Sequence, residues 1–315
     1  MLFAEIFSGA SQLWFLTAWG WFVTVPLYLM HTVFLFYLAL KTKKTTLTQL
    51  YLFGVIFGLY EALITKVLWV GYFDQSGPTW GTFLGLAINE FPVLVFFWHP
   101  IFSFILPILT YEILTKTSIV DHQDILKKTK LKNMLLIILC IGISTFILNG
   151  NQFDLISANS AFIGTLILIG IVYLLLNKKP LSIKHLETLK PALWILALLI
   201  LYGVAFTYLL PERIPDTLMP YLSVLAFYVI TIFLLKISKK GEPIEVEISN
   251  THYQIKDLWI GIGILLLMIN TLIWIPEIST AFSFIFYLSY FGVGIILFLM
   301  TLIKGVLPRK LKDNV

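Results

Sequence analysis

Long apolar runs alternate with short polar gaps along the whole of this chain. Most runs are about 18–22 residues long, the length that an α-helix needs to cross the hydrocarbon layer of a membrane. Strands of a membrane barrel would be about 10 residues long with strict alternation, which the runs do not show. The pattern predicts nine membrane helices, at residues 20–40, 47–69, 83–114, 132–149, 159–177, 191–210, 218–236, 257–275 and 281–303.

Basic residues occupy every second gap between these runs. Short cytoplasmic loops retain Lys and Arg during membrane insertion, so the pattern predicts an N terminus outside and a C terminus in the cytoplasm. The opposite gaps hold only Arg213, and Lys66 lies at or near the end of the second run. The other twenty of the 22 basic residues follow the odd-numbered runs: Lys41, Lys43, Lys44, Lys116, Lys127, Lys128, Lys130, Lys132, Lys178, Lys179, Lys184, Lys190, Lys236, Lys239, Lys240, Lys256, Lys304, Arg309, Lys310 and Lys312.

Composition supports the same class of protein. Of the 315 residues, 59% are hydrophobic and 12% are charged, whereas soluble domains have roughly 45–50% and about 25%. The net charge of +5 borders the apolar runs and covers no single face, so membrane lipid, and not nucleic acid, is the expected partner. We expect one all-α, polytopic integral membrane domain over residues 1–315, located in the cytoplasmic membrane.

The segments outside the runs carry further expectations. Residues 1–19 lack Lys and Arg, which argues against a cleaved signal peptide, and they are expected to form an outer interfacial helix. Residues 132–303 read as three helical hairpins, followed by a cytoplasmic tail at 304–315. The loop 237–256 contains Pro-Ile-Glu-Val-Glu-Ile, whose alternation predicts a short exposed strand.

The third run is too long for one membrane crossing. As one helix, residues 83–114 would measure about 48 Å, against a hydrocarbon layer of roughly 30 Å. Pro92, Pro100 and Pro107 provide places for a break, because proline removes a backbone donor and clashes with the preceding turn. We therefore expect 79–91 to be an interfacial or re-entrant piece and 93–112 to be the span.

Ionisable residues within the apolar runs are concentrated in the first third of the chain, residues 20–114. An ionisable group costs about 2.5–3.5 kcal/mol at the centre of a membrane helix, so its presence needs a reason. The candidate substrate- or ion-binding residues are His31, Glu61, Lys66, Glu90 and His99, with Asn89 beside them. They are expected to share an outward-facing cavity. Glu61 and Lys66 lie about 140° apart on a helix, so Glu61 is expected to pair with another span, through His31 or His99.

Each candidate also has a structural interpretation. Lys66 would extend to the outer surface, each His would bond a carbonyl in the core, and Glu90 would lie exposed at the interface. Glu112, near Lys116, is interpreted as an anchor at the inner end of its span, and Cys140 as a packing residue.

Metal and cofactor sites find little support in the sequence. His31, Glu61, Glu90 and His99 have the donor types of a zinc shell, but no ligand spacing such as His-Glu-x-x-His supports one. No Gly-x-Ser-x-Gly and no phosphate-cradling loop occurs. We therefore expect no metal and no cofactor, and we assign no catalytic residue.

Three functional classes remain open. The first is a transporter or ion- or proton-translocating protein that uses the intramembrane polar cluster. The second is a membrane-embedded enzyme acting on a lipid or lipid-linked substrate near the outer leaflet, with Glu61 or His99 as general base and Lys66 stabilising negative charge. The third is a structural or assembly subunit of a membrane complex. The first is the leading hypothesis, although the one-sided cluster fits an enzyme as well as a transporter. The sequence leaves the substrate and the oligomeric state open.

Overall fold

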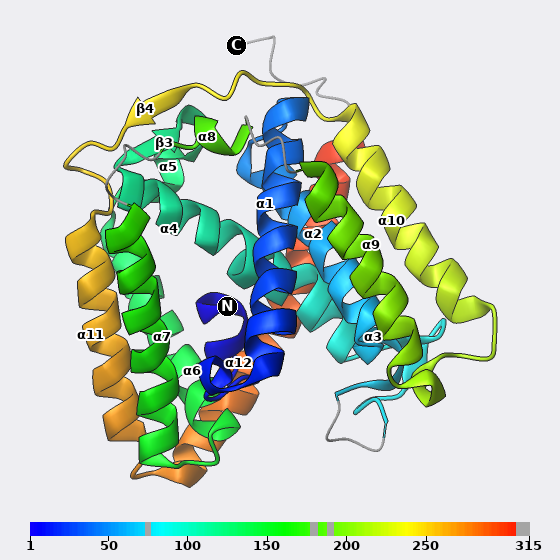
Figure 1. The fold of residues 1–315 in the computed structure, drawn as a ribbon, viewed down its shortest axis with the longest axis horizontal. Coiled ribbons are helices and arrows are strands. Elements are labelled where there is room, and N and C mark those ends of the chain that lie inside the picture. Colours follow the sequence, from blue (N-terminus) through cyan, green and yellow to red (C-terminus); the bar gives the residue numbers. More distant parts are fainter. Residues whose placement is uncertain (73–76, 177–181, 188–191, 307–315) are drawn as a thin grey trace.

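In the computed structural model, the chain folds into a bundle of long helices with very little strand (Figure 1). The structure describes residues 1–72, 77–176, 182–187 and 192–306. Within these residues, eight helical segments are long and apolar enough to cross a membrane. They are α1 (Val25–Thr42, continuing η3, Gly20–Thr24), α2 (Leu47–Ile64), η4 (Pro92–Ile105) with α4 (Leu106–Thr115), α6 (Lys130–Gly150), α7 (Leu155–Leu176), α10 (Met219–Ile237), α11 (Ile255–Leu272) and α12 (Pro276–Val306).

Short elements connect the long helices. They are η1 (Leu2–Ile6), η2 (Trp14–Leu16), α3 (Val67–Val70), β1 (Thr82–Phe83), β2 (Leu86–Ala87), β3 (Thr117–Ile119), η5 (Val120–His122), α5 (Gln123–Leu126), α8 (Lys184–Glu187), α9 (Ala192–Tyr208), η6 (Pro211–Arg213) and β4 (Glu245–Glu247). Strand β1 pairs with β2 and β3 with β4, both antiparallel. The strand expected in the loop 237–256 is therefore β4.

The predicted all-α membrane bundle is confirmed, and the number of nine spans is approximate. Eight predicted spans correspond to the eight long helices, whereas the run 191–210 corresponds to α9, which has 17 residues. The break expected near Pro92 separates the β1–β2 hairpin from the span Pro92–Thr115. Outside the described residues lie the ends of two predicted runs, at 177 and 191, and the basic residues Lys178, Lys179, Lys190, Arg309, Lys310 and Lys312.

The gaps predicted to be cytoplasmic meet at one end of the bundle. Strand β3 pairs with β4, the Lys44 ammonium donates to the Ser238 carbonyl at 2.5 Å, and Lys41 lies 3.6 Å from Glu187. Figure 1 shows β3, β4, α5 and α8 together at this end, which we call the basic end. Four gaps separated by long stretches of sequence thus meet as the alternation requires.

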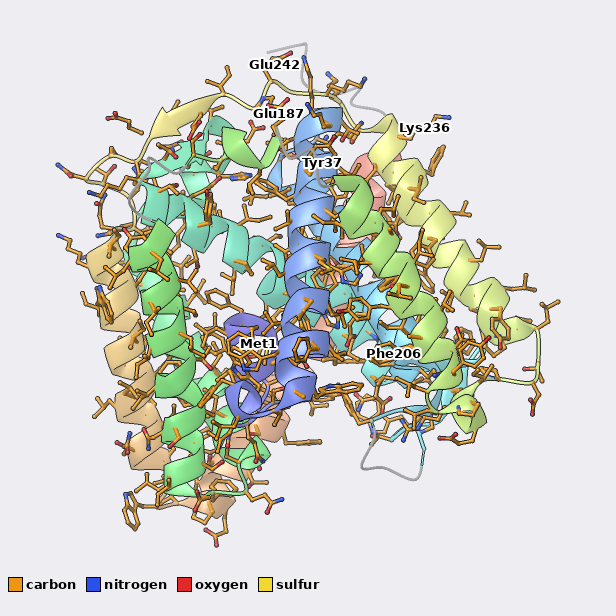
Figure 2. The ribbon with its side chains drawn as sticks, viewed as in Figure 1. Met1, Tyr37, Glu187, Phe206, Lys236 and Glu242 are labelled. Carbon is orange, nitrogen blue, oxygen red and sulfur yellow. The ribbon has the colours of Figure 1, made fainter. Side chains whose placement is uncertain are left out.

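Helix α9 joins the basic end to the opposite end. Glu187, just before α9, pairs with Lys41, and the Lys66 ammonium donates to the Phe206 carbonyl near the end of α9. Figure 2 shows Glu187 and Phe206 at opposite ends of this part of the bundle. At 1.5 Å per residue, 17 residues span about 25 Å. This helix therefore keeps the predicted alternation of ends despite its length.

Burial separates a central pair of helices from the periphery. In α2 and in the segment Pro92–Thr115, 67% of the span residues are buried, against 22% or less in α7, α11 and α12. The peripheral helices expose apolar side chains such as Ile167 and Leu267, as lipid-facing helices do. The most protected environment for a polar group therefore lies between α2 and η4.

The amino-terminal segment differs from its expectation. Residues 1–19 were expected to form a helix on the outer surface, but Ala4, Ile6 and Phe7 are buried, and the Trp98 indole donates to the Ala4 carbonyl at 2.9 Å. Figure 1 shows this end of the chain among the helices. The first part of the segment therefore packs in the core, whereas Leu16 and Trp19 at its end are exposed.

Candidate functional site

Two glycines allow η4 to approach α2 closely. A Cβ atom on Gly54 would lie 2.4 Å from Pro100 Cα, and one on Gly58 would lie 2.9 Å from Val95 Cα. Small residues four apart permit such contact between membrane helices. Phe57 and Glu61 follow on the same face of α2, three and seven residues after Gly54. The packing thus brings Glu61 against η4.

Glu61 and His99 form a contact between these two helices. The Glu61 Oε2 atom lies 2.9 Å from His99 Nε2, and the side chains are only 12% and 2% exposed. The oxygen lies off the direction of an aligned hydrogen bond from this ring nitrogen, so the contact is a close approach of the two polar groups. On its other side, His99 Nδ1 lies 3.1 Å from the Ser103 hydroxyl. The prediction that Glu61 pairs with another span through His31 or His99 is confirmed for His99.

His31 belongs to the same cluster through an aromatic stack. The Phe57 ring lies between the imidazoles, 4.5 Å from His31 and 5.3 Å from His99, in stacked orientation with both. His31 Nδ1 lies 2.8 Å from the Leu27 carbonyl. A carbonyl only accepts, so Nδ1 carries the hydrogen and Nε2 of the neutral ring has a free lone pair. Within the described part of the chain, this buried Nε2 has no hydrogen-bond partner.

Lys66 lies in a different setting. Its ammonium donates to the backbone carbonyls of Phe206, at 2.5 Å, and of Leu209. These carbonyls end α9, where a helix lacks donors and where positive charge is favourable. The structure therefore gives Lys66 a capping role and does not bring it against Glu61, His99 or His31.

Glu90 and Asn89 are also separate from this cluster. Glu90 Oε1 accepts hydrogen bonds from the backbone and the hydroxyl of Thr79, both at 3.0 Å. Both side chains are buried, which differs from the exposed interfacial position considered for Glu90. Glu90 thus ties the segment after Gly77 to the start of η4. Of the five candidates, the structure groups His31, Glu61 and His99 and leaves Lys66 and Glu90 outside.

The donor sets do not form a metal centre in the described residues. No three His, Cys, Asp or Glu side chains among them converge on one point. Glu61 and His99 provide two donors, while His31 is separated from His99 by the Phe57 ring. A structural zinc site needs four ligands, so a zinc shell is not assembled from His31, Glu61, Glu90 and His99.

The structure contains a second His–Glu pair, Glu112 and His122, which was not predicted from the sequence. Glu112 Oε1 lies 2.6 Å from His122 Nδ1 and accepts from the Ile119 backbone at 3.2 Å. His122 Nε2 lies 2.7 Å from the Thr45 carbonyl, and both side chains of the pair are fully buried. Because the carbonyl only accepts, Nε2 carries a hydrogen, and the short contact to Glu112 holds one further proton.

This pair corrects the interpretation of Glu112. Glu112 is a buried partner of His122, whereas the sequence predicted an anchor at the inner end of the span. The hydropathy pattern does not predict that η5 folds back against the end of α4 and places His122 beside Glu112. The available signal was weaker: a carboxylate at the end of an apolar run followed, ten residues later, by a histidine.

Comparison with known proteins assigns a family but no activity. The family described as "Uncharacterized membrane protein family" matches residues 1–312. An Archaeoglobus fulgidus protein described as "Uncharacterized protein" is 44% identical over 119 residues, which cover 36% of this chain and 36% of that protein. The match thus spans about a third of the relative's length. No solved structure matches the chain.

Proposed function

We propose that this chain, which belongs to the uncharacterized membrane protein family matching residues 1–312, is a proton-translocating protein or proton-coupled transporter of the cytoplasmic membrane. Its site is centred on Glu61 and His99. The observation that carries the proposal is their 2.9 Å contact between the two most buried spans. A carboxylate inside a membrane bundle is costly unless it meets a partner or a translocated ion.

The chemistry of the pair suits reversible proton binding. A carboxylate and an imidazole can each bind a proton, and at 2.9 Å the charge of one side chain acts directly on the other. His31 adds a second basic nitrogen across the Phe57 ring, on a third helix. Movement of α1 or η4 relative to α2 would therefore change the proton affinity of the site, which is the coupling that a translocator needs.

The test is proton movement in proteoliposomes loaded with a pH-sensitive dye. We expect the wild-type protein to dissipate an imposed pH gradient faster than protein-free vesicles. Glu61→Gln and His99→Gln should slow this flux about tenfold or more, because removing a positioned proton carrier typically costs 10²–10⁴-fold. Glu277→Gln and His252→Gln are matched controls outside the cluster and should leave the flux unchanged.

Infrared difference spectra during a pH titration provide a measurement that needs no solute. We expect a carboxyl C=O band in wild type that disappears in Glu61→Gln and persists in Glu277→Gln. A wild-type flux equal to that of empty vesicles, together with no Glu61-dependent band, would contradict proton translocation.

A membrane-embedded enzyme is the second candidate, and one observation favours it. An apolar groove of about 710 Å³ lies between the β1–β2 hairpin, the start of η4, α10 and α12, lined by residues such as Phe83, Phe91, Met219 and Phe291. A groove of this kind suits an acyl chain of a lipid substrate. Turnover of a labelled phospholipid or lipid-linked substrate that depends on Glu61 would support this candidate over transport.

A further inference from the structure

A second polar feature lies at the basic end, outside the Glu61–His99 cluster. A surface pocket of about 340 Å³ is lined by Lys116, Asn250, Gln254, Ile255 and Lys256. None of these described lining residues is acidic. The pocket lies where α4 ends and α11 begins, and Figure 1 shows the chain after β4 running down to the start of α11.

Backbone pairing fixes both sides of this pocket. The Lys116 carbonyl accepts from the Ile248 backbone at 3.0 Å, which continues the β3–β4 ladder. On the other side, the Lys128 backbone donates to the Thr251 carbonyl at 3.0 Å, and Tyr253 donates to Leu126 at 2.9 Å. The turn that carries Asn250 is therefore held at both flanks.

Some polar side chains around the pocket already bond to other groups of the protein, and others form no ion pair with it. Gln254 is occupied, because it caps α11 and donates to the Ser249 carbonyl at 2.9 Å. Asp257, the acid closest in sequence to Lys256, pairs with Lys128 at 2.5 Å. Among the described residues, Lys116 and Lys256 form no ion pair, and all three of Lys116, Lys256 and Asn250 are exposed.

Lys116 and Lys256 line one concave surface, so an anion bound there would meet the positive charge of two lysines. Their depth suggests which anion. Lys116 directly follows the span Pro92–Thr115, and Lys256 is the second residue of the span Ile255–Leu272. Both therefore lie where a membrane presents its headgroup phosphates, and basic pockets between helix ends bind such headgroups.

We propose that this pocket binds a phosphate group, supplied by the headgroup of an anionic membrane lipid at the basic end. Lys116 and Lys256 pair with the phosphate oxygens, and the Asn250 amide donates to them. The site is independent of the proposed translocation site, since it shares no residue with it. A free phosphate has the same chemistry, so the experiment compares the two sources.

Native mass spectrometry of the purified full chain, titrated with phosphatidylglycerol or phosphatidylcholine, measures the lipid arm. We expect phosphatidylglycerol to bind at least about tenfold more tightly than phosphatidylcholine. The double variant Lys116→Asn/Lys256→Gln should bind phosphatidylglycerol about 25-fold more weakly, at about fivefold for each lysine near an anionic headgroup. Asparagine is chosen at 116 because the backbone there has φ 60°, which asparagine tolerates well.

The control is Lys239→Gln/Lys240→Gln, which removes the same charge at the same end but outside the pocket. Asn250→Asp keeps both lysines and introduces a negative charge, so its loss of binding should match that of the lysine double variant even if the latter folds poorly. Titration calorimetry with inorganic phosphate forms the other arm. Phosphate binding with the same residue dependence supports the pocket with a free anion as its ligand.

Equal losses of phosphatidylglycerol binding in the pocket and control variants would overturn the proposal, because general surface charge would then explain the binding. Unchanged binding of both probes to Asn250→Asp would overturn it as well.

Discussion

At the scale of single residues, the partner of each buried ionisable group decides what that group can do. Lys66 faces backbone carbonyls, which accept hydrogen bonds but exchange no protons at physiological pH. Glu61 faces the imidazole of His99, a side chain that has both donor and acceptor forms. The two residues are five apart in sequence, yet only Glu61 has a partner suited to proton transfer.

Replacing Lys66 tests this distinction. Lys66→Met keeps the length of the side chain but leaves the final carbonyls of α9 without their donor, so we expect a loss of about 2 kcal/mol of stability. Thermal unfolding in detergent measures the loss, and Lys66→Arg should restore most of it. Proton flux per folded molecule should stay at the wild-type level. A flux defect at unchanged stability would instead return Lys66 to the functional site.

The Glu112–His122 pair predicts a pH dependence of stability. Burial alone would lower the pKa of His122, but the hydrogen bond and charge of Glu112, with the Thr45 carbonyl and Asp121, outweigh burial and raise this pKa. The folded chain thus holds a proton that the unfolded histidine releases near pH 6.5. The resulting stabilisation is complete below about pH 6.5 and is lost as the pH rises through the folded-state pKa.

We therefore expect the apparent melting temperature to fall above about pH 6.5 in wild type and to depend less on pH in His122→Gln. Removing the imidazole also leaves the Glu112 carboxylate buried without its partner, at a cost of about 3 kcal/mol. His252→Gln, in the loop before α11, is the control and should keep the wild-type slope. Identical slopes in all three proteins would show that this pair does not set the pH response.

At the scale of elements, the close packing of α2 against η4 positions the candidate site. The apolar character of both helices was predictable, because hydropathy is a local property of the chain. Their contact was not, because it depends on which faces meet. The sequence Gly54-Val-Ile-Phe-Gly58 was the available signal, since small residues four apart mark the close-packing face of a membrane helix.

Substitution of Gly58 tests this packing. In Gly58→Ala, the new methyl group would lie 2.9 Å from Val95 Cα and 3.3 Å from His99 Cβ. A backbone atom cannot move aside cheaply, so we expect a loss of about 2 kcal/mol of stability and a proton flux reduced toward that of Glu61→Gln.

Gly261→Ala is the matched control, because a Cβ at Gly261 meets nothing within 4 Å. Its stability should stay unchanged or rise slightly, since alanine favours helix more than glycine. Equal effects of the two substitutions would show that close packing at Gly58 is unimportant.

At the scale of the whole molecule, the sequence predicted the bundle well and the polar contacts only partly. The alternation of basic gaps reflects insertion, and the meeting of four such gaps at the basic end agrees with it. The pairing of Glu61 with another span followed from helical geometry. In contrast, the contacts of Lys66 with carbonyls of α9 and of Glu112 with His122 were not predicted. These partners belong to later segments of the chain, and their positions depend on the tertiary fold.

The orientation of the bundle depends on whether α9 crosses the membrane, which single-cysteine labelling can decide. With Cys140→Ser as background, cysteines replace Glu187 before α9, Asp216 after it and Lys240 after α10. The contacts of α9 at both ends of the bundle and the cytoplasmic position predicted for the basic gaps predict different access at these sites. A membrane-impermeant maleimide should label Asp216→Cys in intact cells, and Glu187→Cys and Lys240→Cys only after permeabilisation.

Labelling of Glu187→Cys and Asp216→Cys from the same side would show that α9 does not cross, and eight crossings would then place both termini on one side. Labelling of Lys240→Cys alone in intact cells would invert the orientation, so that the phosphate pocket at the basic end would face the outer leaflet.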